Sequence, residues 1–273
     1  ECRHQSTGAV VEELRSRALS ALGIAEPAAR CAAVGQLANF EGTVDCETAL
    51  AEPAGIPARP ARPLLVAPAA VAQRSVGTAA GRAALLHALA HIEFNAIGLA
   101  LDHVWRFAGL PEAYYRDWVG VAVEEAGHFG MLRGRLVDAG YDYGDFAAHD
   151  GLWEMARRTA DDPLARMALV PRTLEARGLD ASPAVRAKFA AAGDHDSARV
   201  VELILRDEIG HVAIGNRWFR FLCEQRGVDP LATYRQLAQS RRAPPLRGPF
   251  NVPARRQAGF TEKEIDELQR SAR

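Results

Sequence analysis

The stretch VVELILRDEIGHVAIGNRWFRFL, residues 200–222, places an acid and a histidine in a helical pattern that otherwise repeats apolar residues. At helical spacing, Glu208 and His211 fall on the same stripe as the apolar Ile204. Burying an unpaired carboxylate costs several kcal/mol, so the core-facing stripe of a helix normally excludes it. The stretch therefore predicts that something inside the core neutralises these groups.

A second stretch, VEEAGHF at 123–129, has the same form, and it places Glu125 and His128 in an apolar stripe. Two further helical patterns each carry one acid, Glu93 and Glu175, on their apolar stripe. A spacing of three residues brings Glu and His about one turn apart on one face of a helix. The inventory is Glu93, Glu125, His128, Glu175, Glu208 and His211.

A pair of metal ions explains this inventory, because metal ions neutralise carboxylates and take imidazole nitrogens as ligands. Ferritin-like bundles bind such a pair with one Glu from each of two helices and Glu-x-x-His from each of the other two. Spacing supports this interpretation: 32 residues separate Glu93 from Glu125, and 33 separate Glu175 from Glu208. Each half of the bundle would thus supply one side of the site.

The composition limits the class of protein. The chain has 273 residues, 48% of them hydrophobic, and a formal net charge of −1. Near-zero charge gives no indication of a nucleic acid or an anionic membrane as a partner. The cysteines form no C-x-x-C pair, and no uninterrupted apolar run reaches the roughly 18 residues of a membrane span. With no signal-peptide pattern, we expect free thiols and a cytoplasmic protein without a membrane segment.

The hydrophobic periodicity predicts an all-α protein in three parts. Residues 1–77 form an N-terminal helical segment followed by a proline-rich strap at 52–70, residues 78–227 form a di-metal four-helix bundle, and residues 228–273 form a C-terminal extension packed on it. The predicted helices cover 79–107, 111–140, 151–159, 163–178 with an interruption at Pro171, 183–192, 197–227 and 261–272.

The chain resembles a ferritin-like family of bacterial proteins catalogued as a domain of unknown function. The stretches that carry this resemblance are LLHALAHIEFNAI, DWVGVAVEEAGHF, LVPRTLEARGLD and RDEIGHVAIGNRWF, together with ARPARPLLV and GPFNVPARRQAGF. Broader relatives, the tRNA hydroxylase and rubrerythrin groups, are di-iron carboxylate proteins. The resemblance implies a ferritin-like fold and two irons, with manganese or a mixed Fe/Mn pair as the alternative.

These ligands predict an oxidoreductase that activates O₂ or peroxide and hydroxylates or oxidises an unidentified small organic substrate. It would need an external electron donor, because the chain has no redox motif to supply one. The alternatives are a non-catalytic iron-binding or ferroxidase protein and a rubrerythrin-like peroxide scavenger. A substrate-sized cavity beside the metals would favour the enzyme. A homodimer is also left open.

Several polar residues near these stripes have two interpretations each. Glu124 and Asp207 are either solvated interhelical residues or acceptors for the ring N–H of the histidine ligands. His91, Asn95 and Asp102 share one helix face, where they predict an interhelical hydrogen-bond network or a proton relay.

Two residues are candidates for a role beyond the metal ligands. Arg172 adjoins Pro171, which should bend the helix beside Glu175 and open one side of the site. We expect Arg172 to pair with a ligand carboxylate or, alternatively, to meet an anionic substrate. His149, in the loop before 151, could line an entrance.

Overall fold

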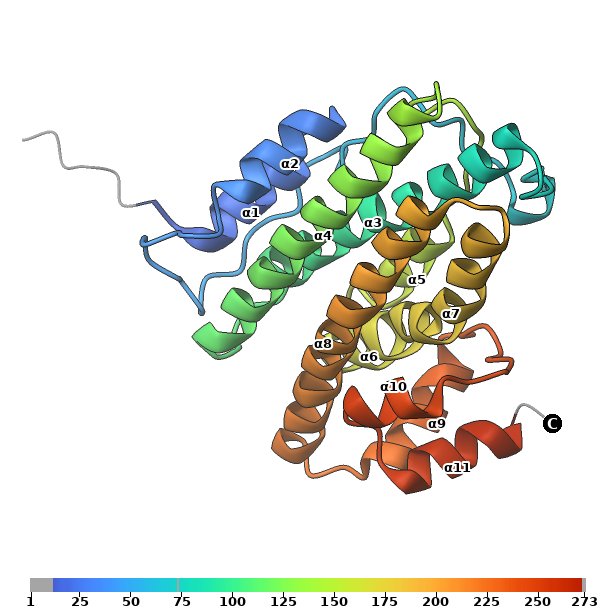
Figure 1. The fold of residues 1–273 in the computed structure, drawn as a ribbon. Helices are drawn as coiled ribbons and strands as arrows, with labels where there is room; N and C mark the ends of the chain where they lie inside the picture. The colour runs from blue at the N-terminus through green and yellow to red at the C-terminus, as the bar shows by residue number, and fades with distance from the viewer. Residues whose placement is uncertain (1–11, 73, 272–273) are drawn as a thin grey trace, which may run out of the picture.

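The structure is a computed structural model that describes residues 12–72 and 74–271, and this part of the chain is helical without a β-strand (Figure 1). Only two isolated β-bridges occur there, Glu13 with Thr43 and Leu65 with Ala148. The predicted all-α class is confirmed. The start of the predicted N-terminal helices and Cys2 lie outside the described residues, and the three described cysteines are free thiols.

Three long helices form the centre of the molecule: α3 (Ala79–Arg106), α4 (Glu112–Asp138) and α8 (His195–Gln225). Their starts follow from capping chemistry. The Thr78 hydroxyl accepts from the backbone N–H of Gly81, and the Asp194 carboxylate accepts from that of Ser197, which satisfies N–H groups that have no partner inside the helix. Helix α4 packs against both α3 and α8.

A broken helix completes the surroundings of the site. It consists of α6 (Pro163–Leu169), the π-helical turns η2 (Val170–Glu175) and α7 (Ala176–Ala191). Pro171 lies at the start of η2, where its missing N–H forces the regular hydrogen-bond ladder to change. Helix α7 packs along α8, so Glu175, the last residue of η2, faces the same region as Glu208.

One prediction about the helices is wrong, and it concerns the region of α7. The sequence predicts separate helices over 163–178 and 183–192, but α7 runs without a break through Pro183. Pro183 cannot donate to the carbonyl of Leu179, one turn earlier. That carbonyl instead accepts from the side-chain amide of Asn251 at 3.1 Å, so a residue distant in sequence replaces the lost bond.

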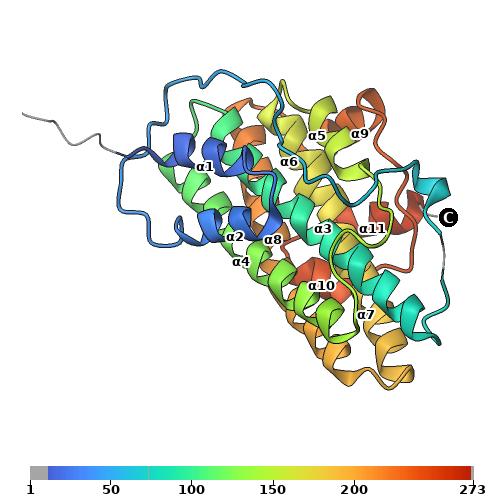
Figure 2. The same cartoon turned by 90° about the horizontal axis from the view of Figure 1, so that it is seen from above.

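The remaining helices cover two sides of this centre (Figures 1 and 2). Helices α1 (Leu14–Leu22) and α2 (Pro27–Gly35) pack on α3 and α4. The C-terminal helices pack on the α6–α8 side. They are α9 (Pro230–Ser240), α10 (Val252–Gln257) and α11 (Glu262–Ser271). The short η1 (Pro68–Ala70) lies in the proline-rich segment, and α5 (Gly151–Arg158) precedes α6.

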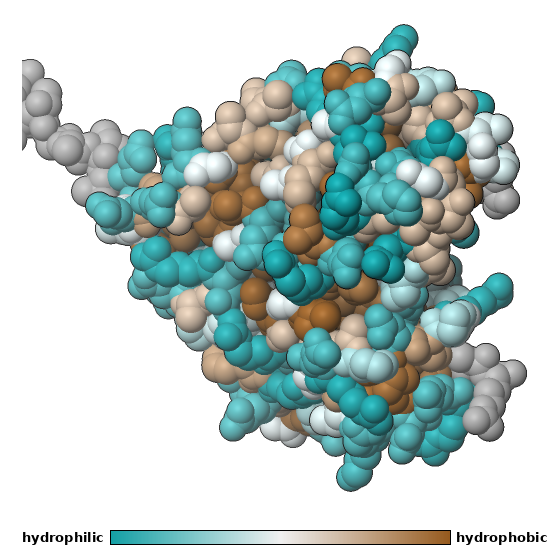
Figure 3. All heavy atoms as spheres, in the orientation of Figure 1, coloured by the Kyte–Doolittle hydropathy of each residue, from teal (hydrophilic) through white to brown (hydrophobic). Residues whose placement is uncertain are grey.

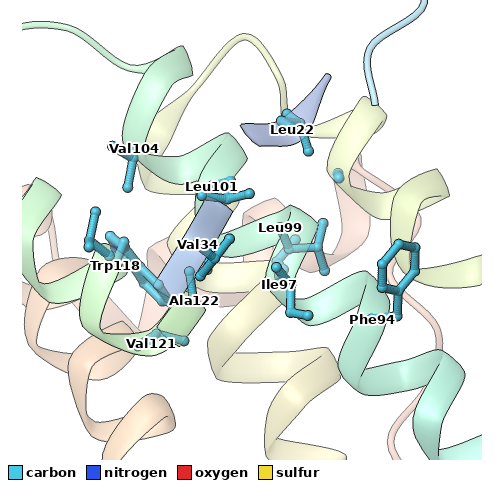
Figure 4. Close-up of a cluster of buried hydrophobic side chains, with 14 of the residues drawn as sticks. Leu22, Val34, Phe94, Ile97, Leu99, Leu101, Val104, Trp118, Val121 and Ala122 are labelled. Carbon is cyan, nitrogen blue, oxygen red and sulfur yellow. The ribbon is translucent and has the colours of Figure 1, made fainter. Parts of the chain in front are cut away.

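Apolar side chains from α1, α2, α3 and α4 form one continuous core (Figure 4). Leu22, Val34, Leu101 and Trp118 are buried there, and burial of each such side chain contributes about 1.5–3 kcal/mol relative to exposure. The buried guanidinium of Arg15 donates to the carbonyls of Val104 and Trp105 and to two carbonyls of the 45–48 segment. It thereby satisfies the C-terminal carbonyls of α3 and holds the N-terminal segment against it.

By length and composition alone, helix α3 is long and apolar enough to cross a membrane. The sequence does not predict this, because it contains no uninterrupted run of apolar residues of that length. However, 72% of its most apolar window is buried inside the fold, as in the core helix of a compact protein. Hydrophilic residues cover much of the face shown in Figure 3, with hydrophobic residues in separate patches.

Gly215 lets α8 approach the π-helical turns. A Cβ at this position would lie 2.6 Å from the Pro171 Cβ, so Gly215→Ala should lower the free energy of unfolding by about 1–3 kcal/mol. The matched control is Gly210→Ala in the same helix, where a Cβ meets open space and helix propensity predicts equal or greater stability. Urea unfolding of the metal-free variants measures both, and equal stabilities would contradict the tight contact at Pro171.

Candidate metal centre

Four of the six predicted ligands converge in the space between α3, α4 and α8. Glu93, Glu125, His128 and Glu208 each offer a ligand atom, and these atoms all lie within 4.8 Å of one another. All four residues are buried. A buried group of three carboxylates and an imidazole at this separation could hold a metal ion.

The other two predicted ligands border this group. His211 Nδ1 lies 3.0 Å from Glu125 Oε1 and 3.6 Å from Glu208 Oε1. Glu175 is close enough for the charges of Glu208 and Glu125 to act on its carboxyl. The broken helix and α8 therefore bring Glu175 and His211 next to the acids that α3 and α4 supply.

Several polar atoms in this cluster are buried without a hydrogen-bond partner. They include one oxygen each of Glu93, Glu175 and Glu208, and Nδ1 of His211. The close approach of His211 Nδ1 to Glu125 does not have hydrogen-bonding geometry. Leaving such atoms unsatisfied costs about 1–3 kcal/mol each. Carboxylate oxygens and an imidazole nitrogen are ligand atoms that metal cations take, so the chemistry of these unsatisfied atoms fits a bound cation.

Two outer carboxylates contact the histidines crosswise between α4 and α8. Glu124 of α4 lies 2.7 Å from Nε2 of His211, and Asp207 of α8 lies 3.3 Å from Nε2 of His128. Both Nδ1 atoms consequently face the buried acids. A carboxylate at the outer nitrogen fixes the ring orientation and holds a proton there, which leaves the inner nitrogen free to act as a ligand.

The electrostatics of the cluster reflect its unusual concentration of acids. Burial, followed by the negative charge of Glu125, raises the pKa of Glu93 well above its ordinary value. Burial and the charge of Glu208 do the same to the pKa of Glu175, and burial and Glu125 raise the pKa of Glu208. These acids hold protons more readily than exposed ones because their ionised forms repel one another in a poorly solvated space.

The pKa values of the two histidines and of Glu125 shift in the direction opposite to the one that burial alone would cause. Burial alone would lower the pKa of His128, but contacts with Glu125 and Glu93 raise it to about 10. Burial would likewise lower the pKa of His211, but contacts with Glu125 and Glu124 hold this pKa well above its ordinary value. Burial would raise the pKa of Glu125, yet His211 and His128 lower it below its usual range.

A cavity of about 610 Å³ adjoins the cluster and reaches three of its acids, Glu93, Glu175 and Glu208. Apolar side chains of α3, α7 and α8 form much of its wall, among them Leu89 and Ile204. The π-helical turns end at Glu175 on this side of the site. This volume lies within the range of about 300–1,000 Å³ that small-molecule pockets occupy.

The two further candidates lie in different places. His149 is exposed and lines the cavity. Arg172 does not line it and pairs with no predicted ligand. Its guanidinium instead donates to Glu264 of α11 at 2.5 Å and to Asn216 of α8 at 2.6 Å. The expected pairing with a ligand carboxylate is therefore wrong, because the C-terminal helix supplies a half-buried acid as the partner.

The polar face of α3 divides into two separate sets of contacts. His91 lies 2.9 Å from the Tyr143 hydroxyl and 3.1 Å from the His149 carbonyl oxygen, and the Asn95 amide donates to the His91 carbonyl. Asp102 forms ion pairs with Arg106 and Arg166 instead. A single network along this face is therefore wrong.

Sequence reasoning missed two arginines that line the cavity, Arg177 of α7 and Arg247 in the segment before α10. Arg177 lies two residues after Glu175, but its position there depends on the π-helical phase of η2. Arg247 belongs to a segment without regular structure, for which periodicity predicts no direction.

The profile of one protein family matches residues 23–266, nearly the whole of the fold described above. The chain belongs to the family described as "Protein of unknown function (DUF455)". It is 50% identical over 218 residues to an uncharacterized protein of Haemophilus influenzae, and this match covers 77% of the chain and 76% of that relative. No solved structure matches the chain.

Metal binding by this family member should release protons. The pKa values of Glu93, Glu175, Glu208, His128 and His211 are all raised. These groups therefore retain protons to higher pH than they would in solution, and a metal must displace those protons. Manganese(II) affinity should therefore increase as the pH rises through neutrality. A pH indicator in weakly buffered solution measures the release, with buffer alone as the control. Metal uptake without proton release would contradict the protonated state of the cluster.

Proposed function

We propose that this protein is a ferritin-like di-iron oxidoreductase that uses O₂ or peroxide to hydroxylate or oxidise a small organic substrate. The observation that carries the proposal is the cavity that reaches Glu93, Glu175 and Glu208. A storage protein needs a route for iron ions, whereas an enzyme needs room for a substrate beside the metals. A largely apolar cavity of substrate size favours the enzyme.

The proposed ligands are Glu93, Glu125, His128, Glu175, Glu208 and His211, in the arrangement of one Glu from each of two helices and Glu-x-x-His from each of the other two. In this proposal, α3, α4, the α6–η2–α7 helix and α8 are the four helices of a ferritin-like bundle. When bound, a pair of irons would supply redox chemistry with a small oxidant. Manganese or a mixed pair would accept the same oxygen-rich ligands.

The protein's own groups would prepare the site in three ways. Glu124 and Asp207 hold a proton at the outer nitrogen of each histidine, which fixes the rings. The buried acids supply negative charge that retains the metals. The apolar cavity wall keeps water away from the reacting end of a substrate. A cytoplasmic location and an external electron donor are further parts of the proposal.

The ligand assignment predicts the metal content of two variants. Protein expressed with added iron should contain about two irons per chain, and Glu125→Ala and Glu208→Ala should each lose most of that iron while remaining helical. Elemental analysis and circular dichroism measure these results. Glu202→Ala is the matched control, because Glu202 is an exposed acid on α8 that pairs with Arg186. Equal iron content in all three variants would contradict the assignment.

The enzyme and the iron store differ in their response to excess iron. Reduced protein loaded with iron should oxidise its own pair once in O₂ and then stop, because further cycles need substrate and an electron donor. The experiment adds many further equivalents of ferrous iron and follows oxidation by absorbance, with metal-free buffer as the control for spontaneous oxidation. Continued oxidation into a soluble mineral-bearing particle would favour storage instead.

A further inference from the structure

The cavity beside the metal centre has two chemically different ends. Glu93 and Glu208 are buried, with 4% and 8% of their surfaces exposed, and they lie at its inner end. Arg177 and Arg247 also line the cavity but are exposed to solvent, and we call the solvent-facing part that they line its outer end. Between these ends, the wall contains mostly alanine, leucine, isoleucine and valine side chains.

The two arginines carry positive charge that the described protein does not neutralise. Neither side chain forms an ion pair or a hydrogen bond with any residue in 12–72 or 74–271. Of the acids in the wall, Glu93, Glu175 and Glu208 are assigned to the metals, and Asp180 is already engaged by the buried guanidinium of Arg255 at 2.6 Å. The outer end of the cavity is therefore positive, while the acids at the inner end are assigned to the metals.

From this arrangement we infer that the substrate is an amphipathic anion, with an apolar body and a single carboxylate or comparable anionic group. Its anionic group binds Arg177 and Arg247 at the mouth, and its apolar end extends toward Glu93 and Glu208. This inference rests on the proposed function and adds the class and orientation of the substrate.

The same features disfavour other ligand classes. A highly polar molecule such as a sugar would leave its hydroxyl groups without partners along an apolar wall, which is unfavourable. A neutral hydrocarbon would bind the wall but gain nothing from the two guanidinium groups. Ile92, which is 47% exposed, adds apolar surface where the cavity meets solvent, so an apolar body also gains contact near the mouth.

Calorimetric titration with three probes tests the inference on both metal-free and manganese-loaded protein. Decanoate has both the apolar chain and the charge, 1-decanol has only the chain, and acetate has only the charge. Decanoate should bind at least about tenfold more tightly than either, because a hydrogen bond to a charged group contributes enough for that factor. Equal binding of decanoate and 1-decanol, or no saturable decanoate binding to either form, would overturn the inference.

Substitutions assign the binding to the two ends of the cavity. Arg177→Gln with Arg247→Gln should weaken decanoate binding about tenfold and leave 1-decanol binding unchanged. Arg186→Gln is the matched control, because Arg186 is exposed on the same helix but pairs with Glu202 and does not line the cavity. Ala181→Trp, which fills the cavity from α7, should abolish binding of both probes at unchanged thermal stability. Full decanoate binding by the double variant would overturn the inference.

These experiments distinguish a failure of the proposed di-iron function from a failure of the proposed ligand class. Decanoate binding that depends on the arginines in a protein that takes up no metal would overturn the di-iron function and keep the ligand class. Uptake of two metals without decanoate binding in either form would overturn the ligand class and keep the di-iron function.

Discussion

The packing of the central helices depends on neutralising a group of buried acids. Glu93, Glu125 and Glu208 come from three different helices and lie together with His128 and His211 in one poorly solvated space. Without compensation, their mutual repulsion would oppose the close packing of α3, α4 and α8. In the metal-free protein, the raised pKa values of these acids and of both histidines favour protonated groups, which reduce this repulsion. Metal ions would replace these protons, and this exchange links the stability of the fold to its proposed function.

The irregular helix gives the site its asymmetry. Pro171 is the second residue of the π-helical segment Val170–Glu175, and Gly215 of α8 provides the space in which Pro171 packs. By contrast, α3 and α4 are regular helices that pack closely on each other, and α3 lines the same cavity through residues such as Leu89 and Ala96. The irregular helix contributes Leu174 and Glu175 to the wall of the cavity, so the backbone irregularity borders the side of the cluster that the cavity reaches.

The sequence predicts the central helices and the convergence of Glu93, Glu125, His128 and Glu208. A polar residue in the apolar stripe of a helix is buried in the core, where it requires other polar groups as partners. Its failures involve partners that are distant along the chain. The continuity of α7 depends on Asn251 replacing a hydrogen bond lost at Pro183. The partner of Arg172 is Glu264 of the C-terminal helix. The arginines of the cavity lie where local periodicity carries no information about direction.

X-ray diffraction at the iron absorption edge, from crystals of the iron-loaded protein, tests whether the buried cluster binds a pair of irons. Two separate anomalous peaks should appear inside the cluster, surrounded by Glu93, Glu125, His128, Glu175, Glu208 and His211. A single peak, or iron bound only elsewhere while these six side chains surround nothing but water, would contradict this prediction.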